Sequence, residues 1–406
     1  MLKTLTAGVL SIALLTSCGS GVVESEPDFF EPELSASFTG VFALTNSVSD
    51  LRLSATSAPR VYAYSLLAGD IAFSNSTDPT YSQADAATAI EYVSSELFKN
   101  NRASEAMRAY RLRFTKEPTE NGLEVGKNII RLSNMDGFNE LPLSANDYQN
   151  TGSSTESMEK YQLDPLWQWE PTGLIKSPAF EPYWGSLKTI ITESEDCVTD
   201  PPDLSVLEAE AKNLLEQTQD LTPTEETELF LAGDGTPTPS GQWLRAVASA
   251  AKENNVSDSD MSALLAKAAI ASYDVSIVVW RDKFFYNIAR PETMWNRLYD
   301  QDIVLTRETP PHPSYPSGHS GFSGAAANIL WFYLGDVPVT FSLPEDMIAE
   351  EEVFTYATPL EAVDAANQSR VDPFFHYPLD TQAGAKVGLC VAKTVNDNYP
   401  NYFLKN

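Results

Sequence analysis

The chain has 406 residues, 43% of them hydrophobic and 20% charged, which is enough apolar material for one large domain or two ordinary ones and excludes a disordered or fibrous protein. Its 56 acidic and 27 basic residues give a net charge of −29, so long-range electrostatics excludes nucleic acid and anionic lipid headgroups as default partners. Three cysteines are too few for a disulfide scaffold, and three histidines leave little room for a histidine-rich metal cage.

The amino terminus is similar to a bacterial lipoprotein signal. Lys3 precedes an apolar stretch at 5–15 that is too short to span a bilayer, and small residues stand directly before Cys18. An ordinary secretory signal or a short buried helix is the alternative. We therefore expect a signal peptide at 1–17, a lipid on Cys18, an acidic flexible tether at 18–35 and a single helical domain at 36–406. The protein would then be an exported lipoprotein of the outer membrane, cell surface or periplasm, attached to the membrane only through this lipid.

Export bears on the other two cysteines, because an oxidising compartment permits a disulfide between Cys197 and Cys390. A sequence cannot show whether their Cα atoms approach within about 7 Å. The simpler prediction is an exposed thiol in a loop at Cys197 and a buried one in the last helix at Cys390.

Helical periodicity is the main pattern of the chain. It predicts helices at 82–98, 103–114, 204–221, 241–253, 258–289, 318–334, 359–369 and 379–395. Residues 150–202 are polar and rich in Pro and Trp, which predicts a long irregular connection, and 335–352 predicts a second long loop or lid. Strand signals are few and isolated. The apolar stretch 261–280 carries Lys267 and Asp274, so we predict a core helix there rather than a membrane span.

Two cations stand near the end of the predicted helix 258–289. Lys283 and Arg290 are seven positions apart, so on one helix they would project from the same face, and Pro291 would end that helix. Two such cations normally form a solvated stripe. Here the neighbouring Phe284 and Trp280 favour partial burial, and buried cations need an anionic partner.

All three histidines lie within 65 residues, at His312, His319 and His376. Before the predicted helix 318–334, Ser317 and Gly318 offer free backbone N–H groups and the positive end of the helix dipole, which suit a tetrahedral oxyanion. His319 would stand beside that anion and exchange a proton with one of its oxygens.

The third motif begins at Ser369 and Arg370. His376 follows after five residues, and Asp380 lies one helical turn beyond it. A carboxylate at that spacing can accept the imidazole Nδ1–H, which leaves Nε2 free to bond a central atom or to attack one.

Together and in this order, Lys-x6-Arg-Pro, Pro-Ser-Gly-His and Ser-Arg-x5-His-x3-Asp resemble the three-part signature of the vanadium haloperoxidase and type 2 phosphatidic acid phosphatase superfamily. The likeness covers 280–380 closely, and 54–64 and 163–185 more loosely resemble exported bacterial haloperoxidase-like lipoproteins. It implies an all-α fold, a helical bundle of the vanadium haloperoxidase and acid phosphatase type with long irregular loops. One departure is Gln242, where related exported proteins often have His.

The resemblance also implies vanadate as the cofactor, at a site that phosphate can occupy too. The residues implied to hold its oxygens are Lys283, Arg290, Ser317, Gly318 and Arg370. His376 would bind vanadium or attack phosphorus, His319 would be the acid–base group, and Trp280 would line the site. His312 stands where the algal bromoperoxidases have His, which implies a catalytic residue; the alternative is a polar loop residue beside prolines.

Two enzyme activities and one binding function stay open. The preferred one is a haloperoxidase that oxidises bromide or iodide with hydrogen peroxide to hypohalous acid. The alternative is a soluble acid phosphatase that hydrolyses phosphate monoesters through a phosphohistidine at His376, with His319 protonating the leaving group and Asp380 orienting His376. The third is a helical surface lipoprotein that binds a ligand or glycan at a relic pocket. The organic acceptor and the oligomeric state are not predictable from these motifs.

Overall fold

A computed structural model of the protein describes residues 34–142, 165–172, 178–200, 203–217, 224–230, 233, 235–300, 303, 305–342 and 353–402. The predicted signal peptide, Cys18 and nearly all of the predicted tether lie outside these ranges. The helices in chain order are α1 (Ala36–Leu51), α2 (Ser57–Ser74), α3 (Ser82–Phe98), α4 (Asn101–Leu112), α5 (Glu120–Ser133), α7 (Leu204–Gln217), α8 (Glu225–Leu229), α9 (Thr238–Glu253), α10 (Asp258–Tyr286), α11 (Pro291–Tyr299), α12 (Gly318–Leu334), α13 (Pro359–Val371) and α14 (Pro378–Tyr402). The all-α prediction is confirmed.

Side-chain caps explain several helix boundaries. Ser257 accepts a hydrogen bond from the Asp260 N–H at the start of α10, and Thr358 accepts one from the Glu361 N–H at the start of α13. The predicted ranges 82–98 and 318–334 agree with α3 and α12. The helices α1, α2, α5, α8 and α11 were not predicted. Because α2 is buried on nearly every side, its sequence lacks the polar stripe on which helical periodicity depends.

The end of α10 differs from its prediction. Asn287 adopts a left-handed conformation with φ 54° and donates its N–H to the Lys283 carbonyl at 2.8 Å, so the helix ends at Tyr286 rather than at 289. The chain then pairs with the irregular connection, where the Ala289 N–H donates to the Trp167 carbonyl at 2.7 Å. Arg290 therefore caps the next helix, α11, and the prediction that it shares one helix face with Lys283 is wrong.

Part of the predicted loop 335–352 is a strand. β1 (Val339–Ser342) pairs antiparallel with β2 (Val353–Tyr356), which is the only sheet among the described residues. Phe341 is buried and its ring lies 4.9 Å from the Trp243 ring. Alternation over only four residues is too short to distinguish a strand from a loop by sequence.

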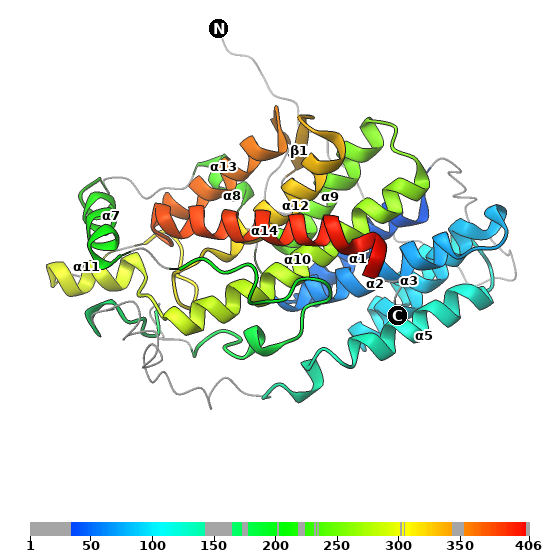
Figure 1. Ribbon diagram of the computed structural model, residues 1–406, viewed down its shortest axis with the longest axis horizontal. Helices are drawn as coiled ribbons and strands as arrows, with labels where there is room; N and C mark the ends of the chain where they lie inside the picture. Colours follow the sequence, from blue (N-terminus) through cyan, green and yellow to red (C-terminus); the bar gives the residue numbers. More distant parts are fainter. Residues whose placement is uncertain are drawn as a thin grey trace, which may run out of the picture. The chain divides into compact units, whose positions relative to one another are not determined.

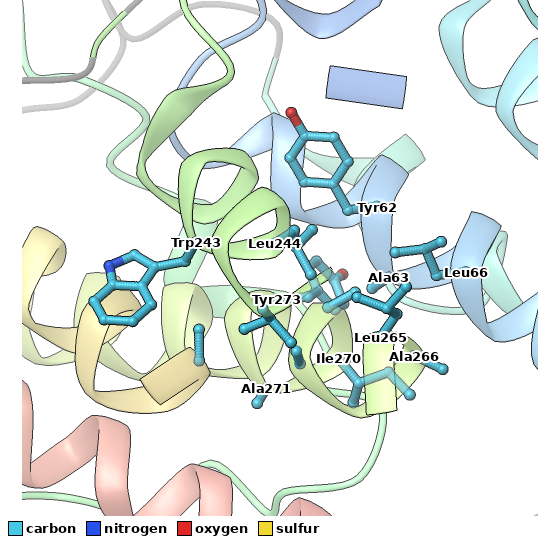
Figure 2. Packing of buried hydrophobic residues seen from close by; sticks show 14 of the residues in the cluster. Tyr62, Ala63, Leu66, Trp243, Leu244, Leu265, Ala266, Ile270, Ala271 and Tyr273 are labelled. Atoms are coloured by element: carbon cyan, nitrogen blue, oxygen red, sulfur yellow. The ribbon is translucent and has the colours of Figure 1, made fainter. Parts of the chain in front are cut away.

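The helix α10 is the centre of the structure and packs against α2, α9, α12 and α14 (Figure 1). Figure 2 shows Tyr62 of α2, Leu244 of α9 and Leu265, Ile270 and Tyr273 of α10 as parts of one buried hydrophobic cluster. By length and composition α10 could cross a membrane, but 89% of its most apolar stretch is buried inside the protein, as in a core helix.

The helices α12 and α14 lie against each other through glycines. A Cβ atom at Gly384 would be 2.2 Å from the Ser317 carbonyl oxygen, and one at Gly388 would be 2.5 Å from the Gly321 carbonyl oxygen. With the backbones this close, the Ser317 N–H donates to the Asp380 carbonyl at 2.9 Å. The fold therefore brings the N-terminal ends of two helices, and the positive ends of their dipoles, to one place.

Residues 178–200, which we call the strap, run irregularly along α10. The N–H groups of Ile190, Ile191 and Thr192 donate to the Asp274 carboxylate at 2.7 to 3.0 Å. Near its end, Cys197 forms a disulfide with Cys390 of α14, with Cα atoms 5.6 Å apart. The prediction of two unpaired thiols is wrong, because Asp274 fixes the strap where Cys197 can reach α14.

Candidate active site

A cavity of about 370 Å³ lies among the N-terminal end of α12, the residues that precede α12 and the residues that follow α13. Six of the predicted site residues line it directly. They are Trp280, His312, Gly318, His319 together with Arg370 and His376, and the remaining wall includes Ala55, Phe180, Pro310, Pro311, Phe322 and Phe375. Arg307 and Glu228 also line the cavity and form an ion pair at 2.7 Å.

Three buried cations converge beside this cavity. Lys283 donates from Nζ to the carbonyl oxygens of Pro313 and Ser314, both at 2.9 Å. Arg290 donates from Nε to the His312 carbonyl at 2.8 Å. Arg370 donates from Nη1 to the Phe230 carbonyl at 3.2 Å. All three are fixed in place by neutral backbone acceptors.

No carboxylate oxygen of the described residues lies within 4 Å of the charged nitrogens of Lys283, Arg290 or Arg370. Burial lowers the pKa of Arg290 to about 10, and burial with repulsion from Arg290 lowers the pKa of Arg370 to about 9. The same two causes hold the pKa of Lys283 well below its ordinary value. The Nε of Arg370 is buried without a hydrogen-bond partner. Buried cations without an anionic partner cost free energy, and a bound anion would offset that cost. The site therefore fits an oxyanion.

Hydrogen bonds at both ring nitrogens orient the side chain of His376. Its Nδ1 donates to the Asp380 carboxylate at 3.0 Å, and its Nε2 lies 3.0 Å from Nη1 of Arg290. Since an arginine only donates, Nε2 is the acceptor and the ring is neutral. Burial, and then the charge of Arg290, hold the pKa of His376 well below its ordinary value. The structure thus places an unprotonated imidazole nitrogen among the three cations.

Asp380 is held in turn by its surroundings. Its Oδ2 also accepts hydrogen bonds from the Ser314 hydroxyl and from the Tyr377 N–H at 3.2 Å. Burial raises its pKa to about 6, so the carboxylate remains mainly ionised at neutral pH. Ser314 was not among the predicted site residues, although it lies in the same Pro-His-Pro-Ser segment as His312.

The start of α12 differs from its prediction in one respect. Ser317 caps the helix, and its hydroxyl accepts from the Ser320 N–H. Its own N–H is used by the Asp380 carbonyl, so the expectation of free N–H groups is wrong for Ser317. Gly318 lines the cavity, where a Cβ atom would be 3.0 Å from the Trp280 ring. His319 also lines the cavity and is partly exposed.

His312 belongs to the cavity wall. Its Nδ1 accepts a hydrogen bond from Nη2 of Arg290 at 2.9 Å, and its ring lies 5.0 Å from that of Trp280. Burial and the charge of Arg290 hold its pKa well below the ordinary value. Phe180 of the strap, which no motif signals, lies 6.3 Å from the His312 ring. Gln242 lies elsewhere and donates to the Leu229 carbonyl at 2.7 Å, which ties α9 to α8.

The described residues contain no group of three or more His, Cys, Asp or Glu side chains placed to hold a bare metal cation. The site instead offers cations, a helix N-terminus and one accepting imidazole nitrogen. That donor set suits a tetrahedral or trigonal oxyanion whose central atom His376 can reach.

Comparisons with known proteins concern the family model and the fold. Residues 302–404 match the family model described as the VCPO second helical-bundle domain. A bacterial vanadium-dependent iodoperoxidase superimposes with a TM-score of 0.72 at 21% identity, over 92% of this chain and 98% of that one. A bacterial vanadium-dependent chloroperoxidase in its holo form superimposes with a TM-score of 0.63 at 14% identity, over 93% and 95%. No curated protein matches in sequence. At sequence identities of 21% and 14%, these structural superpositions establish the fold alone.

Proposed function

We propose that this chain is a vanadate-dependent haloperoxidase of the vanadium haloperoxidase and type 2 phosphatidic acid phosphatase superfamily. It would oxidise bromide or iodide with hydrogen peroxide. The observation that carries the proposal is the group of three buried cations without a carboxylate partner around the accepting Nε2 of His376. The iodoperoxidase and chloroperoxidase with the same fold support it.

The residues of the site fit vanadate. Lys283, Arg290 and Arg370 would offset its negative charge, and the buried Nε of Arg370 is a donor without a hydrogen-bond partner among the described residues. Gly318 at the start of α12 would face an oxygen of the anion. His376 would bind vanadium through Nε2, because Asp380 holds its proton on Nδ1.

Bound vanadate supplies a Lewis acid that activates peroxide toward a halide without a change in the oxidation state of the metal. The chain supplies the rest. His319, partly exposed in the cavity, would take a proton from incoming peroxide and return it to a leaving oxygen. Arg290 links the two other histidines, since it donates to His376 and to His312. The rings of Trp280 and Phe180, with centroids 6.4 Å apart, would shield one side of the bound anion from water.

A phosphatase could use the same groups, with His376 attacking phosphorus and His319 protonating the leaving oxygen. The experiment therefore compares two assays on purified protein. One contains vanadate, hydrogen peroxide and bromide or iodide, and the other contains p-nitrophenyl phosphate. We expect halide oxidation that requires added vanadate and little phosphate release. Vanadate-independent phosphate release with no halide oxidation would assign the phosphatase activity instead.

Two arginine variants make the test specific to the site. Arg370→Met removes a cation that has no carboxylate partner, and we expect it to lower vanadate affinity at least tenfold, about 1.4 kcal/mol. Arg245→Met is the matched control, because Arg245 of α9 lies outside the cavity and donates to the Thr45 hydroxyl of α1 at 2.7 Å. It should leave vanadate affinity unchanged. Equal effects of both variants on vanadate affinity would contradict the assignment of Arg370 to the anion site.

A further inference from the structure

The helix α4 carries a basic surface on a strongly acidic protein. Residues 99–116 contain six basic residues and one acidic residue, whereas the whole chain has 27 basic and 56 acidic residues. Arg111 is buried and pairs with Glu91, so a partner cannot reach it. The other five basic residues are exposed and form what we call the basic face: Lys99, Arg102, Arg108, Arg113 and Lys116.

Few acidic side chains accompany the basic face. The exposed ones on α4 and on the helices it packs against, α1 and α3, are Asp50, Glu96 and Glu105. Asp50 pairs with Arg102 at 3.2 Å, but both side chains are more than half exposed, and such pairs contribute little stability. Arg102 can therefore turn toward another anion. A surplus of positive charge remains here, although acidic residues outnumber basic ones twofold in the chain as a whole.

An apolar side chain lies among these cations. Leu112, the last residue of α4, is 46% exposed. The opposite side of α4 packs into the hydrophobic core through Met107 and Tyr110. A helix with one buried side, and with arginines around an exposed leucine on the other, suits the surface of a membrane. There the cations contact phosphates and the leucine contacts acyl chains.

The amino-terminal end of the domain lies against α4. The hydroxyl of Tyr110 donates to the carbonyl of Ala36, the first residue of α1, at 2.8 Å. The described chain begins at Leu34, which is 16 positions after Cys18. The predicted flexible tether would have an end-to-end distance of about 22 Å over this length. A lipid on Cys18 would therefore hold α4 within reach of the headgroups.

The net charge of −29 opposes anionic lipids only at long range. Salt at physiological strength screens charges beyond about 8 Å, so a headgroup in contact with α4 responds mainly to the basic face. Each Lys or Arg close to an anionic membrane contributes about 1 kcal/mol to its binding. An anchor that brings α4 to the membrane removes the long-range barrier, and the local attraction then acts.

We propose that the basic face of α4 docks on anionic phospholipid headgroups, as a second membrane contact beside the predicted lipid on Cys18. This contact is independent of the proposed haloperoxidase function. It would also orient the protein. Ser37 of α1 bonds to Ser262 of α10 at 2.9 Å, and Lys283 lies 21 positions further along α10, about 31 Å at 1.5 Å per residue. The anion site would lie at the other end of α10 from the docked helix.

The test replaces residues 1–18 with a histidine tag and anchors the protein to vesicles that contain a nickel-chelating lipid, so its outcome does not depend on acylation of Cys18. With Cys197 bonded to Cys390, the substitution Leu112→Cys supplies the single thiol for a fluorophore that brightens when it leaves water. We expect its emission to rise about twofold or more on vesicles rich in phosphatidylglycerol, but not on phosphatidylcholine, and to fall back at high salt.

The matched control label is Leu298→Cys on α11, where the leucine is 49% exposed. Its emission should be the same on both kinds of vesicle, because α11 follows the end of α10 that carries Lys283. A rise at both labelled positions would indicate contact without a preferred face and would overturn the proposal. Equal emission of the Leu112→Cys label on the two kinds of vesicle would overturn it as well.

Two triple variants with the same change in charge separate the basic face from net charge. The first combines Arg102→Gln, Arg108→Gln and Arg113→Gln, and should abolish the rise at the Leu112→Cys label. The second combines Lys127→Gln, Arg131→Gln and Lys386→Gln, which are exposed residues of α5 and α14, and should retain it. Equal losses in both variants would overturn the proposal.

Thermal unfolding checks that each variant is folded. If the arginine variant is not, the pair Lys99→Gln and Lys116→Gln, outside α4, decides the case and should lower the rise at the Leu112→Cys label. Polyglutamate is the probe for an acidic protein as the partner instead. Binding of polyglutamate that requires the three arginines, with no response to phosphatidylglycerol, would overturn the assignment to a membrane.

Discussion

Buried arginines in this protein are of two kinds. Arg60 pairs with Asp136 at 2.7 Å, and Arg111 pairs with Glu91, so each cation is offset inside the protein. Arg290 and Arg370 are also buried, but their hydrogen-bond acceptors are neutral: carbonyl oxygens for both, and the imidazole nitrogens of His312 and His376 for Arg290. This contrast distinguishes a structural arginine from one that awaits a ligand, since an uncompensated buried charge destabilises the unliganded protein.

Anion binding should therefore take up protons. Burial and the neighbouring cations hold the pKa values of His376, His312 and Lys283 below their ordinary values, and a bound anion offsets those cations and raises them. Groups whose pKa rises on binding favour the complex at low pH and lose that contribution as the pH rises through the pKa of the bound state. Calorimetry with sulfate, which does not titrate near pH 7.5, in two buffers of different ionisation enthalpy should give net proton uptake. Proton release would contradict the electrostatic picture of the site.

Halide choice should depend on His312. Chloride is the hardest of the three halides to oxidise, and a hydrogen-bonding histidine in the wall resembles the bromoperoxidase arrangement. We expect iodide and bromide to be oxidised and chloride poorly. His312→Phe removes the acceptor that Nη2 of Arg290 uses, so it should leave the iodide rate largely intact and change the bromide or chloride rate.

Steady-state rates with each halide provide the measurement for His312. A change of less than about twofold in all three halide rates, roughly 0.4 kcal/mol in activation free energy, would show that His312 takes no part in halide choice.

The motifs around Lys283, Arg290, Arg370, His376 and Asp380 could be found in the sequence because each is local and rich in unusual residues. The contacts that complete the site could not. Phe180 contacts Trp280 across 100 positions, and it lies on a strap that Asp274 and the disulfide hold in place. Such long-range contacts leave no periodic or spacing signal.

At the scale of helices, α12 and α14 set the geometry of the site. Their glycines let the backbones touch, so Ser317 at the start of one helix bonds to Asp380 at the start of the other. The sequence predicts both helices but not their contact. The small residues of α12 and α14 are visible in the sequence, yet the partner of each is determined only by packing.

Gly384→Ala should separate these two helices. The new Cβ atom would meet the Ser317 carbonyl at 2.2 Å, a backbone atom that cannot rotate away, so we expect a loss of about 1–3 kcal/mol of stability and much weaker vanadate binding. Urea unfolding and calorimetry measure the two effects.

Gly40→Ala of α1 is the matched control for Gly384→Ala, because its nearest neighbours are tips of side chains at 3.2 Å. If both variants lose equal stability and neither loses vanadate affinity, the helix contact does not position the site.

At the scale of the whole molecule, the disulfide joins the strap to the last helix. Removing it by the double substitution Cys197→Ser and Cys390→Ser should lower the free energy of unfolding by about 2–5 kcal/mol, because the unfolded chain loses a long closed loop. Reduction of the unsubstituted protein should have the same effect in urea unfolding. A change under about 0.5 kcal/mol in both experiments would show that the bridge adds no stability.

The lipoprotein-type signal before Cys18 predicts that the protein is attached to a membrane through a lipid. Produced from its full sequence in a bacterium, the protein should be found in the membrane fraction, with a lipid mass on the peptide that begins at Cys18. Cys18→Ser should remove the lipid and release the protein on export. An unmodified Cys18 in soluble wild-type protein would contradict the lipoprotein prediction.

The disulfide also makes the site-bearing part of the chain a covalent ring. Cys197 and Cys390 are separated by 193 positions, and every side chain proposed to hold the anion, from Lys283 to His376, lies between them. A protease that cuts once inside this ring opens it but releases no fragment, because the bridge still joins the two pieces. A nicked molecule would therefore migrate as one species on a gel without reductant and as two with it. The nicked molecule keeps both pieces because the disulfide joins them covalently, whatever the packing around the cavity.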